Sequence, residues 1–154
     1  NMGTGRMMGF IDNVAPSPHD AKPEKTTTGK ELCYDQSQPA VLFVFKSHIE
    51  PNLGKISYFK VLSGEVTASS ELINAQTGIV ERFHQLFIMD GKTRNPIEKL
   101  VAGDIGATLK LKDTYTNQTL HAKGFDVVVQ PIEFPSPRIQ VAVIAKSKND
   151  DEKI

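Results

Sequence analysis

The stretch that decides the fold is residues 101–120, VAGDIGATLKLKDTYTNQTL. Along residues 105–111 every second side chain is apolar, and the side chains between them are small or charged. Successive side chains of a β-strand point to opposite faces of a sheet, so this alternation predicts a half-buried strand. Its apolar face carries Ile105, Ala107, Leu109 and Leu111, and its other face carries Gly106, Thr108 and Lys110.

The turn before this strand contains Gly103 and Gly106, which raises the question of a phosphate-binding loop. A glycine-rich phosphate loop is followed by a helix whose amides face the phosphate, and a P-loop also needs a Lys-Ser or Lys-Thr pair. A strand pattern follows here instead. The sequence therefore favours a turn that feeds a strand, with Asp104 accepting hydrogen bonds from nearby amides, and a phosphate cradle is the alternative.

The rest of the chain predicts further strands at a spacing of roughly ten residues. These segments are rich in β-branched and aromatic residues, and Asp90-Gly91, Asn95-Pro96 and other glycines and prolines punctuate them. The predicted strands cover residues 40–46, 54–66, 71–74, 78–89, 126–130 and 138–145. Many short strands with turns between them indicate an antiparallel sandwich or a small closed barrel, so we predict an all-β fold.

The two ends of the chain have other patterns. Residues 7–14 place apolar side chains at helical spacing, and the prolines that follow end this helix. Residues 19–38 are polar and almost without core-forming side chains, which predicts an irregular linker at a domain boundary. Near the C-terminus, Asn149 and Glu152 have the spacing of a capping pair and predict the start of another helix.

Composition excludes several classes of function. The 154 residues include 18 basic and 18 acidic side chains, so net charge gives no argument for a nucleic-acid or membrane partner. Cys33 is the only cysteine, and the four histidines stand far apart, unlike zinc ligands. No apolar run approaches the roughly 20 residues that span a bilayer. We expect an excised, soluble piece from a reducing cytoplasm, with no metal site and no membrane partner.

Basic side chains cluster in sequence around two predicted hairpins, where they are suited to contact RNA phosphates. They are Arg82, Lys92, Arg94, Lys110 and Lys112. Solvated lysines on exposed strand faces are the alternative, because no aromatic side chains are interleaved there.

No catalytic constellation is visible. His84 lies in a strand segment where it could act as a general base, but no partner is evident. A half-exposed strand histidine is the favoured interpretation of His84, and equally of His48 and His121. The serines at positions 63, 69 and 70 lack the context of a nucleophile elbow.

Several segments, taken in order, resemble the second, β-barrel domain of the elongation factor G family of translational GTPases. The family's opening strand corresponds to PAVLFVFK (residues 39–46), and its apolar-Arg-Val-x-Ser-Gly motif corresponds to FKVLSG (residues 59–64), where Lys60 replaces the Arg. Residues 81–120 resemble the following hairpin, the Ala-Gly-Asp-Ile turn and the Leu-Lys-Asp segment with its closing Thr-Leu. Tetracycline-resistance ribosomal protection factors and the GTPase release factor share the barrel, usually lack that complete arrangement, and are the alternatives.

The resemblance covers nearly the whole chain and implies its organisation. Residues 1–18 resemble the tail of the upstream GTPase domain, residues 19–38 are a linker, residues 39–130 are the barrel, and residues 131–154 begin a third, α/β domain. The phosphate loop, magnesium ligands and guanine-reading motif of such GTPases lie upstream. The resemblance thus implies GTP and magnesium for the parent chain, and no cofactor, metal or catalytic residue in this fragment.

The resemblance also implies partners, namely the upstream GTPase domain, the downstream domains and small-subunit ribosomal RNA. The possible RNA contacts, on the hairpin that matches residues 82–94, are Arg82, Gln85, Met89, Lys92 and Arg94. Gln85, Ile88 and Asp90 depart from the family's often basic or polar residues, which indicates a divergent paralogue with a lower salt sensitivity of RNA contact. The implied function is noncatalytic ribosome docking during translocation. A flavin-binding or small-molecule-binding barrel is the alternative from another class.

Overall fold

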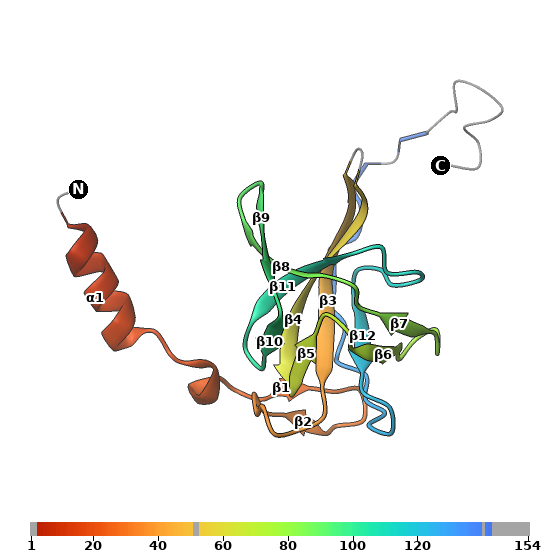
Figure 1. The fold of residues 1–154 in the computed structure, drawn as a ribbon, viewed down its shortest axis with the longest axis horizontal. Coiled ribbons are helices and arrows are strands. Elements are labelled where there is room, and N and C mark those ends of the chain that lie inside the picture. Colours follow the sequence, from red (N-terminus) through yellow and green to blue (C-terminus); the bar gives the residue numbers. More distant parts are fainter. Residues whose placement is uncertain (1–2, 51–52, 140, 143–154) are drawn as a thin grey trace.

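The central element of the computed structural model, which describes residues 3–50, 53–139 and 141–142, is a long antiparallel hairpin. It consists of β3 (Val41–Glu50) and β4 (Gly54–Ser63) (Figure 1). Both strands are rich in β-branched and aromatic residues, which favour an extended backbone. The four consecutive residues 41–44 are all buried, so the hairpin is covered on both faces at this end.

Eight strands form one antiparallel sheet in the order β7-β6-β12-β3-β4-β11-β8-β9. The strands that flank the central hairpin are β6 (Glu71–Asn74), β7 (Val80–Arg82), β8 (Leu86–Asp90), β9 (Thr93–Ile97), β11 (Ile105–Leu109) and β12 (Gln118–His121). Two small ribbons pair β5 (Glu65–Thr67) with β10 (Lys99–Val101), and β1 (Glu24–Lys25) with β2 (Glu31–Leu32). The sheet curls into a half-barrel, which confirms the predicted all-β, barrel-type fold (Figure 1).

One apolar core fills the interior of the half-barrel. Within the described residues no ladder joins the edge strands β7 and β9, so the sheet stays open between them. Phe83 and Leu86, at the connection from β7 to β8, are buried in this core together with Val66 and Leu100 of the β5–β10 ribbon. The Phe83 ring packs edge-on against Phe59, with centroids 5.7 Å apart, a geometry that aromatic pairs prefer. The β7–β8 connection and the β5–β10 ribbon therefore pack into the interior of the half-barrel.

A second apolar cluster covers the outer face of the β3–β4 hairpin. Two segments from outside the sheet, residues 24–34 and 125–130, supply its other half, and we call them the covering segments. The cluster contains Leu32, Tyr34, Val41, Phe43, Leu62, Ala102, Val127 and Val129. Residues 19–38 are predicted to be almost without core-forming side chains, and Leu32 and Tyr34 are the buried exceptions, because they pack against the outer face of the sheet.

The predicted strand at residues 126–130 is an extended segment held by a single bridge, between Val129 and Thr26. Beside this bridge the amide of Thr27 donates a hydrogen bond to the carbonyl of Val128 at 2.9 Å. These bonds join the two covering segments to each other. The prediction of a regular strand is wrong because its partner is the irregular turn between β1 and β2.

Of the strand predicted at residues 105–111, residues 105–109 form β11, and Ala107 is buried as predicted, but the faces of its neighbours differ from the expected ones. Ile105 is 56% exposed, whereas Gly106 and Thr108 are buried. A Cβ atom on Gly106 would meet the side chains of Leu100 and Phe59 in the interior core. The small residues therefore face inward, because they leave room for large side chains from neighbouring strands.

Lys110 explains how the buried Gly106 and Thr108 are compatible with a buried Leu111. Its backbone is left-handed, with φ at 59°, which ends the regular alternation of β11. The next side chain, Leu111, consequently points into the interior core. A local irregularity of one residue exchanges the faces of a strand.

The turn predicted at Asp90-Gly91 is confirmed and joins β8 to β9, with Gly91 at a φ of 57°. The pair Asn95-Pro96 predicts a break, but β9 continues through it. β9 is an edge strand, where the missing amide donor of proline removes no ladder bond.

The predicted N-terminal helix is confirmed as α1 (Thr4–Val14), and a short 3-10 helix, η1 (Pro18–Asp20), follows it. α1 lies apart from the sheet, and none of its residues is buried (Figure 1). At the other end, residues 138–139 and 141–142 of the predicted last strand are not in a strand. The remainder of that strand, and the helix predicted near Asn149, lie outside the described residues.

A buried polar network ties β6 and β7 to the segment that follows β11. The Glu81 side chain, in a residue only 1% exposed, accepts hydrogen bonds from the amides of Lys112 and Asp113 at 2.8 Å each. It also accepts a hydrogen bond from the Thr114 hydroxyl at 2.7 Å, and Asn74 donates to that same hydroxyl at 3.1 Å. Each donor finds an acceptor, as buried polar groups require.

We expect Glu81→Ala to lower the free energy of unfolding by roughly 3–5 kcal/mol, because three donors, one of them the buried Thr114 hydroxyl, lose their acceptor. Urea denaturation followed by circular dichroism measures this difference. Glu98→Ala, at an exposed position, is the matched control and should change stability little. A loss of stability no larger than that of the control would show that the network is dispensable.

Candidate nucleic-acid interface

The β8–β9 hairpin brings together three of the five candidate RNA contacts. Met89 and Arg94 are directly opposed in its register, and Lys92 lies in the loop at its tip. Gln85 precedes β8 and has an exposed side chain at the base of the hairpin. Of the β8 residues only Phe87 pairs with β11, so the distal part of the hairpin extends beyond the sheet (Figure 1).

Arg82, the fifth candidate, does not belong to this hairpin. It lies on β7, at the opposite edge of the sheet, and Figure 1 shows β7 and β9 well apart. Its Nε atom is 3.7 Å from Oε1 of Glu71, and both side chains are more than half exposed, so the pair contributes little stability. The grouping of residues 82–94 into one hairpin is therefore wrong for Arg82, since β7 pairs with β6 rather than with β8.

Arg94 is the most constrained cation of the hairpin. It is half-buried, and its Nη1 atom is buried without a hydrogen-bond partner among the described residues. A desolvated guanidinium that lacks an acceptor is costly, so an incoming acceptor would gain from a small adjustment of this side chain. Guanidinium groups pair with phosphate through two parallel hydrogen bonds, whereas the Lys92 ammonium is a point charge.

The other two cations of the sequence cluster, Lys110 and Lys112, lie after β11 and not on the hairpin. Both are exposed. The amide of Lys110 donates to the carbonyl of Lys55 at 3.0 Å, which places this segment beside the start of β4. The five basic residues that cluster in sequence are therefore spread over three places in the fold.

The backbone donors of the turn at residues 101–104 are used within the protein. The amides of Ala102, Gly103 and Asp104 donate to the carbonyl groups of Gly64, Val61 and Val101 respectively. The amide of Val101 donates to the Asp104 carboxylate at 2.8 Å, which confirms the predicted cap. The turn is a structural corner that fastens β11 to β4, and its amides are not presented to a phosphate.

Pro18, in the segment that follows α1, packs against this turn. Gly103 has a φ of 100°, and a Cβ atom there would lie 2.6 Å from Cγ of Pro18. Nearby, the Tyr34 hydroxyl donates to Oε1 of Glu24 at 2.6 Å, and the Lys60 ammonium donates to the same hydroxyl. Lys60 Nζ is 3.7 Å from the Glu24 carboxylate and 4.5 Å from the centroid of the Tyr34 ring. We call Glu24, Tyr34 and Lys60 the clasp, because they hold a covering segment to β4.

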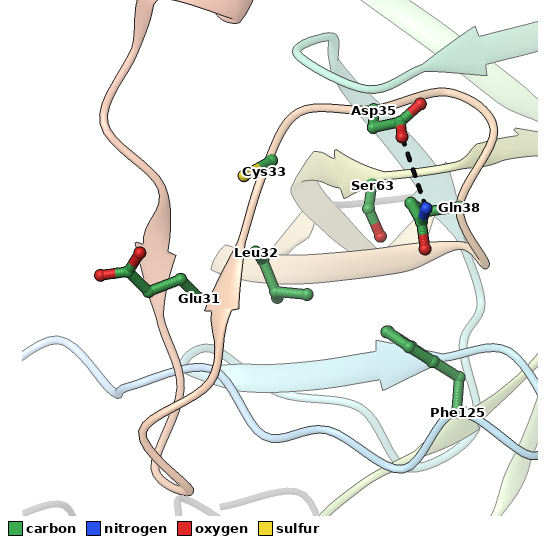
Figure 2. Close-up of a pocket in the computed structure, with 7 residues that line it drawn as sticks. All are labelled: Glu31, Leu32, Cys33, Asp35, Gln38, Ser63 and Phe125. Carbon is green, nitrogen blue, oxygen red and sulfur yellow. Dashed lines mark hydrogen bonds between the residues drawn. The ribbon is translucent and has the colours of Figure 1, made fainter.

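A cavity of about 290 Å³ lies beside the turn into β3. Figure 2 shows the residues that line it, Glu31, Leu32, Cys33, Asp35, Gln38, Ser63 and Phe125. The amide and hydroxyl of Ser37 donate to the Asp35 carboxylate at 2.8 and 2.7 Å, and these bonds hold the pKa of Asp35 below its ordinary value. The Ser63 hydroxyl donates to the carbonyl of Pro39 at 2.7 Å. These polar groups shape the turn into β3, so the cavity presents no activated nucleophile.

The histidines occupy three different environments. His84 is exposed, and His48 is exposed with its ring stacked on Tyr58. His121 is only 4% exposed, which corrects the prediction of a half-exposed residue, because the covering segments lie over the end of β12. Its Nδ1 atom lies 3.0 Å from the carbonyl oxygen of Ala122. Over the described ranges, no three His, Cys, Asp or Glu side chains gather where they could hold a metal ion.

Comparison with known proteins identifies the family. The model of elongation factor G domain 2 matches residues 39–123, more than half of the chain. The chain belongs to the elongation factor G domain 2 family. It is a translation-factor module, and the matched region contains the whole curled sheet but neither α1 nor the covering segments.

A crystal structure of a protein from Thermus thermophilus has the same fold. The TM-score is 0.68 at 21% sequence identity, over 98% of this chain. The chain spans 21% of the length of that Thermus protein. Among the described residues, the structure contains no helix with the length and apolar character needed to cross a membrane.

The clasp predicts a stability change at high pH. Burial, and then the hydrogen bond to Glu24, raise the pKa of Tyr34 above its ordinary value of 10.0. The protonated phenol therefore stabilises the fold below pH 10.0, and this contribution is lost as pH rises above that value. We expect Tyr34→Phe to be less stable than the parent chain by about 1–2 kcal/mol at neutral pH, and this difference to shrink above the ordinary pKa.

Urea unfolding at a series of pH values measures the difference between the two chains. Tyr115→Phe, at a residue that is 54% exposed, is the matched control, and its stability difference should stay near zero. A Tyr34→Phe difference that does not vary with pH would contradict the clasp as described.

Proposed function

We propose that this chain is the noncatalytic, ribosome-docking barrel module of an elongation factor G-like GTPase that acts in translocation of tRNA and mRNA in the cytoplasm. The observation that carries the proposal is the projecting β8–β9 hairpin of an elongation factor G domain 2, which presents Lys92 and Arg94 at a sheet edge. Small-subunit ribosomal RNA is the proposed partner.

The contacts follow from the chemistry of the hairpin. Arg94 would pair with a phosphate through its planar guanidinium, Lys92 would add a point charge, and Met89 and Gln85 would pack against sugar or base edges. Arg82, on the other edge of the sheet, would contact a separate part of the RNA. Each neutralised phosphate contributes about 0.7–0.9 to the slope of log affinity against log salt.

The same proposal assigns GTP and magnesium to an upstream domain of the parent chain. Support comes from α1, whose exposed apolar side chains have no cover in the described structure. These side chains are Met7, Met8, Phe10, Ile11 and Val14. We propose that the GTPase domain covers this stripe, because a helix with an apolar face is stable only when that face is packed. The clasp then transmits displacements of α1 to the barrel, which would couple nucleotide state to ribosome docking.

Charge reversal in the full-length parent tests the hairpin. We expect the double variant Lys92→Glu and Arg94→Glu to raise the KM for ribosomes in ribosome-dependent GTP turnover by about tenfold at low salt, because attraction to phosphate becomes repulsion. The dependence of turnover on salt should flatten as well. Arg82→Glu is measured separately, since it probes the other edge of the sheet.

Lys30→Glu, an exposed charge reversal on a covering segment, is the matched control and should leave turnover unchanged. If the double variant and the parent have equal turnover at every salt concentration, the hairpin does not contact the ribosome.

A further inference from the structure

The outer face of the β3–β4 hairpin carries a groove of about 380 Å³ that the hairpin contact proposed above does not use. Its walls include the apolar side chains of Phe43, Phe45, Ile105 and Ile132, and Glu24 and Lys60 of the clasp lie at its margin. Ile105 and Ile132 are 56% and 43% exposed, so this groove offers apolar surface to a partner. A mostly apolar groove with a few polar groups is the usual lining of a small-ligand site.

A cluster of aromatic and basic side chains continues the groove towards the tip of the hairpin. The Tyr58 ring lies 6.4 Å from the ring of Phe45, which also lines the groove. The His48 ring stacks on Tyr58, with centroids 5.7 Å apart and the planes at 14°. Lys46, directly opposite Tyr58 in the register, holds its Nζ atom 5.6 Å from the centroid of the same ring. The groove and the cluster therefore form one continuous surface.

The surface carries one positive charge, at Lys46, that no described carboxylate neutralises. Lys46 and His48 are exposed, and the described residues place no carboxylate oxygen within 4.0 Å of the Lys46 ammonium. Aromatic faces beside free cations are the combination by which proteins bind unpaired nucleotides, because the bases stack and the phosphates meet the cations. A double helix cannot use it, since its bases are already stacked on each other.

We propose that Lys46, His48, Tyr58 and the adjoining groove bind unpaired nucleotides of RNA. One base stacks on the exposed His48 ring, which Tyr58 supports, a neighbouring base lies in the groove against Phe45 and Ile105, and the phosphate between them meets Lys46. The site lies on β3 and β4, whereas the contact proposed above lies on β8 and β9, so it is a second RNA contact that does not depend on the first.

Fluorescence anisotropy of the chain with a short fluorescein-labelled oligoribonucleotide of mixed sequence tests the site, with the duplex of the same sequence as comparison. We expect the single strand to bind more tightly than the duplex. The double variant His48→Ala and Tyr58→Ala should weaken binding of the single strand about tenfold, because stacking is lost. Lys46→Gln, at an exposed residue, should lower the salt slope by about 0.7.

Lys123→Gln is the matched control for the loss of one charge. It is exposed and follows β12, whose last residue pairs with Val41 at the opposite end of β3, so its affinity and salt slope should equal those of the parent chain. The double variant Lys92→Glu and Arg94→Glu separates the two RNA contacts. The second site is supported if the His48 and Tyr58 double variant and Lys46→Gln weaken single-strand binding. The hairpin variant should then change only the salt dependence of binding.

Three results would overturn the second site. They are equal binding of duplex and single strand, an unchanged affinity of the His48 and Tyr58 double variant, and loss of single-strand binding in the hairpin variant alone. The last result would leave the β8–β9 contact in place. If an apolar peptide displaces the RNA, and Lys46→Gln leaves the affinity for that peptide unchanged, the groove is a peptide site instead.

Discussion

The constraint on which the rest of the structure depends is that one end of β3 is apolar on both faces. Residues 41–44 are buried in succession, with Leu42 and Val44 in the interior core and Val41 and Phe43 in the outer cluster. Each such side chain stabilises the fold by about 1.5–3 kcal/mol when it leaves water, so neither face can remain uncovered. The curled sheet covers one face, and the covering segments must cover the other, although they lie outside residues 39–123 that match the family.

This second layer connects the barrel to the upstream part of the chain. Pro18 rests against Gly103, and the clasp fixes Tyr34 and Glu24 on Lys60 of β4. The segment that leads away from α1 is therefore held at several points and is not a loose tether. These contacts fix residues 18–34 on the barrel at the turn before β11 and on β4.

Much of the fold could be predicted from sequence because it follows from local rules. The helix before Pro16, the turn at Asp90-Gly91 and the Asp104 cap each depend on residues within a few positions. The faces of β11 could not be predicted, because the depth of a side chain depends on what the neighbouring strands contribute, and Gly106 leaves room for Leu100. The candidate site was predicted in part. Met89, Lys92 and Arg94 lie together on the β8–β9 hairpin. Arg82 lies at the other edge of the sheet, because its strand, β7, pairs with β6.

By itself, the sequence determined the all-β class, the order of most strands and turns, and the resemblance to elongation factor G domain 2. These properties follow from periodicity, from glycine and proline stereochemistry and from short motifs, each of which involves only a few neighbouring residues. Only the tertiary structure decided which side chains face inward, that residues 24–34 and 125–130 cover β3, and that Lys46 and Tyr58 stand opposite each other. Such contacts join residues distant in the chain, and their energies depend on burial and register that no local pattern records.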